Sequence, residues 1–286
     1  MAYILALGSA ALYGAADFLG GLASRRASTI AIVLTSHAVG LALLVLILPL
    51  LPDATPSRGD LAWGGLAGLA GGIGVALLYR ALAVGLMAIV APVSAVCAVT
   101  IPVTAGVLLG DGLPWLTIVG VGLAIVAIAL VSQGTARPSG RRDGTVPRGV
   151  GLALTSGVAI GLFFLALAET NAGAGMWPLV SARVASVTLF GAMGLVGGQP
   201  LRMEAPVTRI AVAAGVIEVC ANALYLLATR YGSLSVVVTL SSLYPASTVI
   251  LARLTLGEHL NPWQALGLAC ALVAIALIVS CSGSPL

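Results

Sequence analysis

Charged side chains are scarce in this chain, and one kind is missing altogether. Only 8% of its 286 residues are charged, and all 13 basic residues are arginines, because the sequence contains no lysine. Hydrophobic residues make up 60% of the chain, and its mean hydropathy is +1.14. A soluble domain of this length could not bury so much apolar surface, so the composition predicts an integral membrane protein.

Aromatic residues are also few, at 5% of the chain, whereas glycine occurs 36 times. Small residues allow helix backbones to approach one another closely in lipid, so this composition favours a bundle of transmembrane helices. The formal net charge of +4 comes from arginines in short loops, where they control the direction of membrane insertion. We therefore expect membrane lipid as a partner, and no nucleic acid.

The sequence lacks the residue clusters that metal sites, cofactor sites and membrane enzymes need. Its four cysteines form no Cys-x-x-Cys pair, and no ATP-binding motif is present. The two histidines, His37 and His259, lie far apart in the sequence, and no paired acidic motif accompanies them. We therefore expect no metal, no cofactor and no enzymatic activity.

The apolar segments predict ten transmembrane helices, joined mostly by loops of a few residues. The exception is segment 134–149, whose four arginines, four glycines and two prolines predict a solvated linker. We therefore expect a five-helix unit over 1–133, a linker over 134–149 and a second five-helix unit over 150–286. The first span begins at Met1 without a positive segment before it, which argues against a cleavable signal peptide. The expected spans are approximately 2–23, 29–51, 61–80, 87–109, 114–133, 150–169, 175–197, 207–230, 233–256 and 262–281.

The two predicted units are related by an internal repeat with an offset of 147 residues. Ser9 corresponds to Ser156, and the Ala127–Leu130 segment corresponds to Ala274–Leu277. Because each copy contains an odd number of spans, the second copy must enter the membrane upside down relative to the first. Inverted repeats are typical of transporters, whose two halves rock around a central site. The sequence thus predicts an all-α integral membrane fold of ten transmembrane helices in two inverted five-helix repeats.

One segment of each repeat carries a further pattern, in which a span ends with Leu-Gly and an acidic residue, and Pro-Trp follows. These segments are Leu109-Gly110-Asp111 with Pro114-Trp115, and Leu256-Gly257-Glu258 with Pro262-Trp263. Together with the ten spans, they make the whole chain resemble the EamA-type transporters of the drug/metabolite transporter superfamily. The resemblance implies export or exchange of small metabolites, amino acids or drugs, often against a proton.

The orientation of the chain in the membrane stays open between two predictions. Most arginines outside the spans fall on the side opposite the N-terminus, which places that side in the cytoplasm and both termini outside. The family resemblance implies the reverse, with both termini in the cytoplasm. In either orientation we expect a multi-pass protein of the inner (plasma) membrane.

Ionisable residues within the spans are the candidates for function, because the centre of a bilayer penalises them by about 2.5–3.5 kcal/mol. Glu218 lies near the middle of its span, and Asn222 and Tyr225 follow at i+4 and i+7 on the same helix face. We interpret this stripe as part of the substrate path, with Glu218 binding a proton or a cation. Arg183, near the middle of span 175–197, could bind a substrate carboxylate. The alternative is a structural ion pair between Glu218 and Arg183.

Two further candidates lie in the first two spans. Tyr13 and Asp17 are four residues apart on one helix face, and the Asp17 carboxylate is predicted to face the substrate path. The alternative for Asp17 is an ion pair with Arg25 or Arg26. His37 stands near the middle of the second span, where it could shuttle protons or simply form a structural hydrogen bond.

Prolines within two of the predicted spans are candidate hinge or gating residues. Pro92 and Pro102 fall in span 87–109, and Pro245 falls in the corresponding span 233–256. Each removes a backbone hydrogen bond and can bend its helix. Bent helices at matching positions of two halves are typical of transporter substrate sites.

These features favour a secondary transporter that exports a small molecule by alternating access. The expected partners are a small-molecule substrate and a proton or solute counter-ion, and a fused pair of halves is consistent with a monomer. An uptake carrier, a flippase for lipid-linked substrates and a membrane scaffold are the alternatives.

Overall fold

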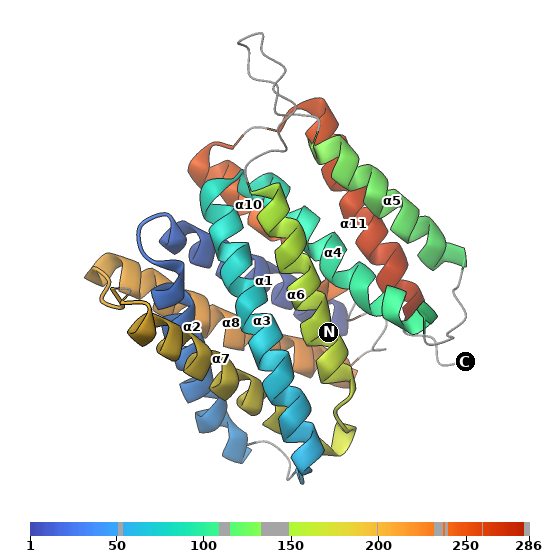
Figure 1. Cartoon of the computed structure of the whole chain (residues 1–286). Coiled ribbons are helices and arrows are strands. Elements are labelled where there is room, and N and C mark those ends of the chain that lie inside the picture. Colours follow the sequence, from blue (N-terminus) through green and yellow to red (C-terminus); the bar gives the residue numbers. More distant parts are fainter. Residues whose placement is uncertain are drawn as a thin grey trace.

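A computed structural model describes most of the chain, and all regular secondary structure in the described ranges is helical (Figure 1). These ranges are 1–50, 54–108, 115–132, 149–198, 200–231, 237, 240–258 and 260–282. The linker predicted over 134–149 lies outside them except for Gly149. The helices in order are α1 (Ala2–Ser24), α2 (Thr29–Ile47), η1 (Leu48–Leu50), α3 (Arg58–Val84), α4 (Met87–Leu108), α5 (Trp115–Ser132), α6 (Val150–Ala168), η3 (Ala172–Ala174), α7 (Trp177–Val196), α8 (Ala205–Tyr231), α10 (Tyr244–Leu256) and α11 (Pro262–Ser282).

Ten α-helices thus occupy the described ranges, one for each predicted span. Seven of them are long and apolar enough to cross a membrane within the described residues, so the chain is a multi-pass membrane protein. These seven segments are Ala2–Ser24, Thr29–Leu50, Arg58–Val84, Val150–Ala168, Trp177–Val196, Ala205–Tyr225 and Pro262–Val279.

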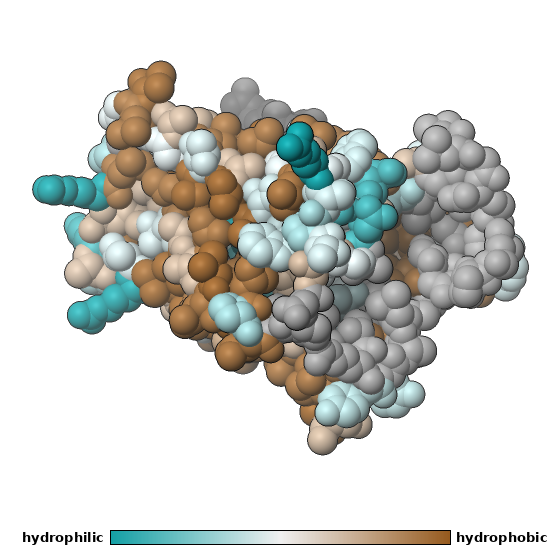
Figure 2. Space-filling model, turned by 90° about the horizontal axis from the view of Figure 1, so that it is seen from below, coloured by the Kyte–Doolittle hydropathy of each residue, from teal (hydrophilic) through white to brown (hydrophobic). Residues whose placement is uncertain are grey.

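The outer surface of the bundle matches a lipid environment. Hydrophobic side chains cover a broad area in the view of Figure 2, and hydrophilic side chains project from it at a few places. Leu195, Val196 and Leu254 have exposed fractions of 78%, 90% and 77%. Exposed apolar area on this scale requires an apolar solvent around the helices.

Helix packing follows the internal repeat. Helix α1 packs on α8, and α6, which corresponds to α1, packs on α3, which corresponds to α8. The Ser9 hydroxyl donates to the Ala221 carbonyl at 2.9 Å, and the Ser156 hydroxyl donates to the Gly74 carbonyl at 2.8 Å. Both pairs of partners, 9 with 156 and 74 with 221, differ by 147. The two halves therefore use the same hydrogen bond at the same helix contact.

Two contacts join helices that correspond to each other in the repeat. Helix α2 packs on α7, and α5 packs on α11. In Figure 1, α5 and α11 lie side by side at one edge of the bundle. Corresponding glycines allow α3 and α8 to approach this central α2–α7 pair. A Cβ on Gly68 would lie 2.0 Å from the Ala182 carbonyl oxygen, and one on Gly215 would lie 2.5 Å from the Ser36 carbonyl oxygen.

The two halves also differ in some of their helix contacts, and the clearest difference concerns α1 and α3. Helix α1 also packs on α3, where a Cβ on Gly20 would lie 2.1 Å from Tyr79 Cζ and one on Gly21 would lie 2.6 Å from Leu82 Cβ. The corresponding helices α6 and α8 make no comparable contact in the part of the chain that the structure describes. The bundle is therefore closed between α1 and α3 and spread between α6 and α8.

Local sequence explains where two helices begin and end. Helix α3 starts at Arg58, three residues before the predicted span, because Ser57 and Asp60 form a reciprocal capping box. Helix α10 ends at Gly257, whose φ of 64° suits glycine and turns the chain towards Glu258. In the described part of the predicted span 233–256, a turn at Ser242 and Leu243 precedes α10.

Candidate functional site

The charged residues predicted within the spans meet in the middle of the bundle. Arg183 on α7 forms an ion pair with Glu218 on α8. Their side chains are 15% and 21% exposed, so both are largely removed from solvent. Gly40 of helix α2 lies next to the guanidinium, because an added Cβ there would be in ordinary contact with Arg183 Nε at 3.7 Å. The ion pair that the sequence offered as an alternative is thus present, and it joins two helices of the second half.

The polar stripe on α8 connects this pair to α1. The Tyr13 hydroxyl donates to Asn222 Oδ1 at 2.7 Å, and Asn222 Nδ2 donates to the Glu218 carbonyl one turn earlier at 2.8 Å. Tyr225 lies one turn further along the same helix and is partly buried. The structure therefore brings Tyr13, Glu218 and Asn222 together across the contact of α1 with α8.

Asp17 lies one turn after Tyr13 on α1 and is close enough to Glu218 to interact with it electrostatically. Its carboxylate makes no hydrogen bond or ion pair within the described residues, and it is partly accessible. The alternative that paired Asp17 with Arg25 is wrong, because Arg25 contacts Glu258 instead. Asp17 is therefore an uncompensated carboxylate inside the bundle.

Tyr244 and Tyr79 complete the surroundings of Asp17, and neither was a leading candidate from the sequence. The rings of Tyr13 and Tyr244 meet edge to face, with centroids 6.5 Å apart. Tyr79 is 2% exposed and lies against Gly20 on the other side of Asp17 along α1. Tyr79 lies at the end of the predicted span 61–80, where no feature of the sequence singled it out. Glycine spacing on α1 was the signal that could have found it.

His37 is buried between α2 and α7, where its Nδ1 forms a hydrogen bond with the Ser186 hydroxyl. Ser186 was not predicted, although it lies three residues after Arg183 on the same face of α7. His37 Nε2 is buried and has no hydrogen-bond partner within the described residues. His37 therefore lies beside Arg183 and not next to Asp17.

The candidate hinge prolines lie in α4 and α10. Pro92 and Pro102 are both inside α4. Pro245 stands in the first turn of α10, directly after the turn at Ser242 and Leu243. The chain is therefore interrupted just before Pro245, and Tyr244 begins the helix that follows the interruption.

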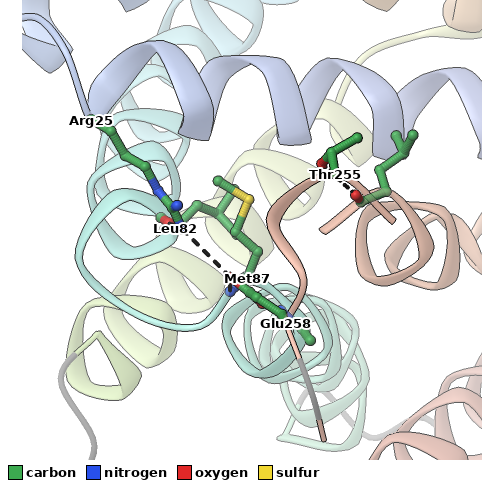
Figure 3. A network of polar contacts seen from close by, with 7 residues as sticks. Arg25, Leu82, Met87, Thr255 and Glu258 are labelled. Atoms are coloured by element: carbon green, nitrogen blue, oxygen red, sulfur yellow. Dashed lines mark hydrogen bonds and ion pairs between the residues drawn. The ribbon is translucent and has the colours of Figure 1, made fainter. Parts of the chain in front are cut away.

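A second polar network lies at the end of the bundle where α1 finishes, and Figure 3 shows it. Glu258 accepts hydrogen bonds from the backbone N–H groups of Met87 at 3.1 Å and Ala88 at 3.0 Å. Arg25 reaches Glu258 at 3.5 Å and the Leu82 carbonyl at 3.5 Å. The acidic residue of the Leu-Gly-Glu motif therefore caps the N-terminus of α4, a helix of the other half. Asp111, its counterpart in the repeat, lies outside the described residues.

The central site contains acidic, basic and phenolic groups, but not a metal-binding arrangement. Among the described residues, no group of three or more His, Cys, Asp or Glu side chains could hold a metal ion. Asp17 and Glu218 can bind protons or cations, and Arg183 can bind an anion if Glu218 releases it. Such a site can bind a small charged or polar molecule between two halves of a membrane bundle.

Comparison with known proteins agrees with this architecture. The EamA-like transporter family model matches residues 1–133 and 147–280. A solved crystal structure of another protein has a TM-score of 0.60 over 96% of this chain and 95% of that chain, at 17% sequence identity, which shows a shared fold. No curated protein matches the sequence significantly. The family match covers both halves of the bundle and most of its length, and the chain belongs to the EamA-like transporter family, a group of membrane transporters in the drug/metabolite superfamily.

Proposed function

We propose that the protein is a secondary active transporter that exports small metabolites, amino acids or drugs from the cell by alternating access. In this proposal ten transmembrane helices form two inverted repeats, 1–133 and 150–286, joined by the linker 134–149 and set in the inner (plasma) membrane. A coupled carrier runs in the direction that its gradients dictate, so uptake requires no different site.

The central cluster is the single observation that carries the proposal. Asp17 and Tyr13 come from the first half, and Arg183, Glu218 and Asn222 come from the second. Charged groups within membrane helices are expensive, and they normally line the path of a substrate or an ion. A site built from both halves changes its access when the halves move relative to each other.

The unequal helix contacts support alternating access. Helix α1 is closed on α3, whereas the corresponding helices α6 and α8 are not packed together in the described residues. In an inverted repeat these two contacts lie at opposite ends of the bundle. If the two halves exchange conformations, α6 closes on α8 while α1 leaves α3, and the open end changes sides. The interruption before Pro245 and the prolines Pro92 and Pro102 in α4 are the proposed hinges.

Coupling in this proposal runs through the carboxylates. Asp17 has no partner among the described residues, and Glu218 is paired with Arg183. A proton or a substrate cation on either carboxylate therefore changes the net charge of the site. His37 is the third group that could bind a proton, through its unpartnered Nε2. A group that binds the proton and the substrate alternately exchanges one for the other.

The test is flux in proteoliposomes with a panel of amino acids, amines and cationic drugs, each with and without a pH gradient. Wild type is compared with Glu218→Gln and with Arg183→Gln/Glu218→Gln, in which neither member of the ion pair keeps a charge without the other. Glu204→Gln makes the same chemical change at an exposed position and serves as the matched control. We expect gradient-driven flux in wild type and control, and its loss in both cluster variants. Unchanged flux in the folded double variant would remove the ion pair from the mechanism, and no flux of any solute would overturn the proposed function.

A further inference from the structure

We propose that Asp17, together with the rings of Tyr13 and Tyr244, forms a subsite for a positively charged group, so that the transported solute is an organic monocation such as an amine. The inference rests on the proposed transport function and adds the charge of the substrate. The evidence for it is the charges and aromatic rings of the cluster, together with the close helix contacts that glycines of α1 make on either side of Asp17.

With both of its carboxyl groups ionised, the cluster has a net charge of minus one. Away from the helix ends, the described helices contain the charged residues Asp17, Arg183 and Glu218. Arg183 and Glu218 neutralise each other, which leaves Asp17 without a counter-charge. A second positive charge at His37 would lie beside the Arg183 guanidinium, so His37 cannot supply it at low cost. An uncompensated carboxylate in a bilayer is unfavourable, and binding a cation removes that cost.

The aromatic groups next to Asp17 suit an organic cation. Tyr13 lies one turn before Asp17 on the same face of α1, and its hydroxyl is held by Asn222. Tyr244 meets Tyr13 edge to face, and its phenol is within electrostatic range of Asp17. Both rings are partly accessible. The faces of aromatic rings attract ammonium groups, and a carboxylate beside them adds a full opposite charge.

Glycines on α1 hold these rings in place on both sides of Asp17. A Cβ on Gly14 would lie 2.3 Å from the Tyr244 carbonyl oxygen, so any larger residue would push Tyr244 away. The Thr248 hydroxyl donates to the Gly14 carbonyl at 3.0 Å and fixes α10 against α1 there. Three residues after Asp17, Gly20 admits the buried ring of Tyr79. In this conformation, close helix contacts therefore lie on both sides of Asp17 along α1.

The internal repeat gives the number of such subsites. Tyr13 and Asp17 correspond to Ile160 and Phe164 in α6, 147 residues later, and neither of these is polar. The second half thus has no equivalent carboxylate at this position. The repeat therefore contains one such subsite, in the first half.

The first experiment measures binding to the full-length protein in nanodiscs by titration calorimetry. The probes are phenethylamine, 2-phenylethanol, phenylalanine and 3-phenylpropionate, which are similar in size and differ in charge, with tetraethylammonium as a second cation. We expect the cations to bind at least about tenfold more tightly than the neutral, zwitterionic and anionic probes, a difference of about 1.4 kcal/mol.

Variants assign that preference to the subsite. Asp17→Asn should lower cation affinity at least about tenfold and leave the other probes unchanged, whereas Asp17→Glu should keep the preference and Glu204→Gln should change nothing. Tyr244→Phe keeps the ring and should retain cation binding, and Tyr244→Leu should weaken it. Equal cation affinity in wild type and Asp17→Asn overturns the inference, as does failure of both cations to bind wild type.

Flux separates this inference from the proposed function. The same probes are loaded into proteoliposomes that contain wild type or Asp17→Glu. Transport of cations that compete with one another supports the inference. Transport of neutral or zwitterionic probes without cations overturns the substrate class and leaves the transporter in place. No flux of any probe or of the wider solute panel removes both.

Discussion

The α1–α8 contact and the α6–α3 contact correspond to each other in the internal repeat, but only the α1–α8 contact contains the charged residues of the central site. Both are fixed by a serine hydroxyl bound to a carbonyl, Ser9 to Ala221 and Ser156 to Gly74. Close to these bonds, α1 and α8 present Tyr13, Asp17, Glu218 and Asn222, whereas the corresponding positions of α6 and α3 are Ile160, Phe164, Gly71 and Val75.

This difference separates the residues that build the fold from those that act on a substrate. The helix contacts need the serines and small residues, which occur in both copies. The charges occur in one copy, so the other copy shows that the same scaffold packs without them. Phe164, at the position that corresponds to Asp17, is 47% exposed and fits an apolar surrounding.

The largest effect is expected from breaking the Arg183–Glu218 pair on one side. Arg183→Leu or Glu218→Leu leaves a buried charge without its partner and should destabilise the protein by about 3–5 kcal/mol. The corresponding residues in the first half, Ser36 and Gly71, are uncharged, so the fold itself does not require the pair. Arg183→Leu/Glu218→Leu should therefore be much closer to wild type than either single variant.

The measurement is the thermal midpoint and the yield of monodisperse protein in detergent for the three variants and wild type. A double variant as unstable as the worse single variant would show that the pair is structural. The two contacts would then differ in stability as well as in chemistry.

Sequence alone predicted the repeat and the helices well because both depend on local patterns. The 147-residue offset anticipated the paired serine bonds, and apolar length located the helices. The partners of the polar residues were harder to predict, since helix faces meet only in three dimensions. Arg25 was considered as an alternative partner of Asp17 because it is near in sequence, but it contacts Glu258, which is 233 residues away. Tyr79 was missed because its contact with Gly20 leaves no motif in the sequence, and Ser186 was missed because its partner His37 lies on another helix.

A second comparison concerns the α1–α3 contact, which has no counterpart between α6 and α8. Gly20→Ala places a methyl group 2.1 Å from Cζ of Tyr79, whose side chain is buried. We expect a loss of about 1–3 kcal/mol. At Gly122 on α5 an added Cβ meets nothing within 4 Å, so Gly122→Ala should be neutral or stabilise by up to about 1 kcal/mol.

The corresponding residues of the second half suggest the rescue for Gly20→Ala. Position 20 corresponds to Leu167 and position 79 to Leu226, so a leucine already stands where the first half has Tyr79. Gly20→Ala/Tyr79→Leu should recover much of the lost thermal stability in detergent. If Gly20→Ala is as stable as Gly122→Ala, the close α1–α3 contact does not exist in the protein.

The smallest effect is expected at the network that ties the two halves together at the end of α1. Glu258 is 8% exposed and accepts hydrogen bonds from two N–H groups at the start of α4, so Glu258→Ala should cost about 1–2 kcal/mol. The Arg25 side chain is 31% exposed and lies 3.5 Å from Glu258, so solvent screens the pair, and Arg25→Gln should cost at most a few tenths of a kcal/mol. Thermal midpoints at low and high salt separate the two contributions, because only the Arg25 part should decrease with salt. Equal losses in the two variants would make the ion pair, and not the helix cap, the main link between the halves at this end.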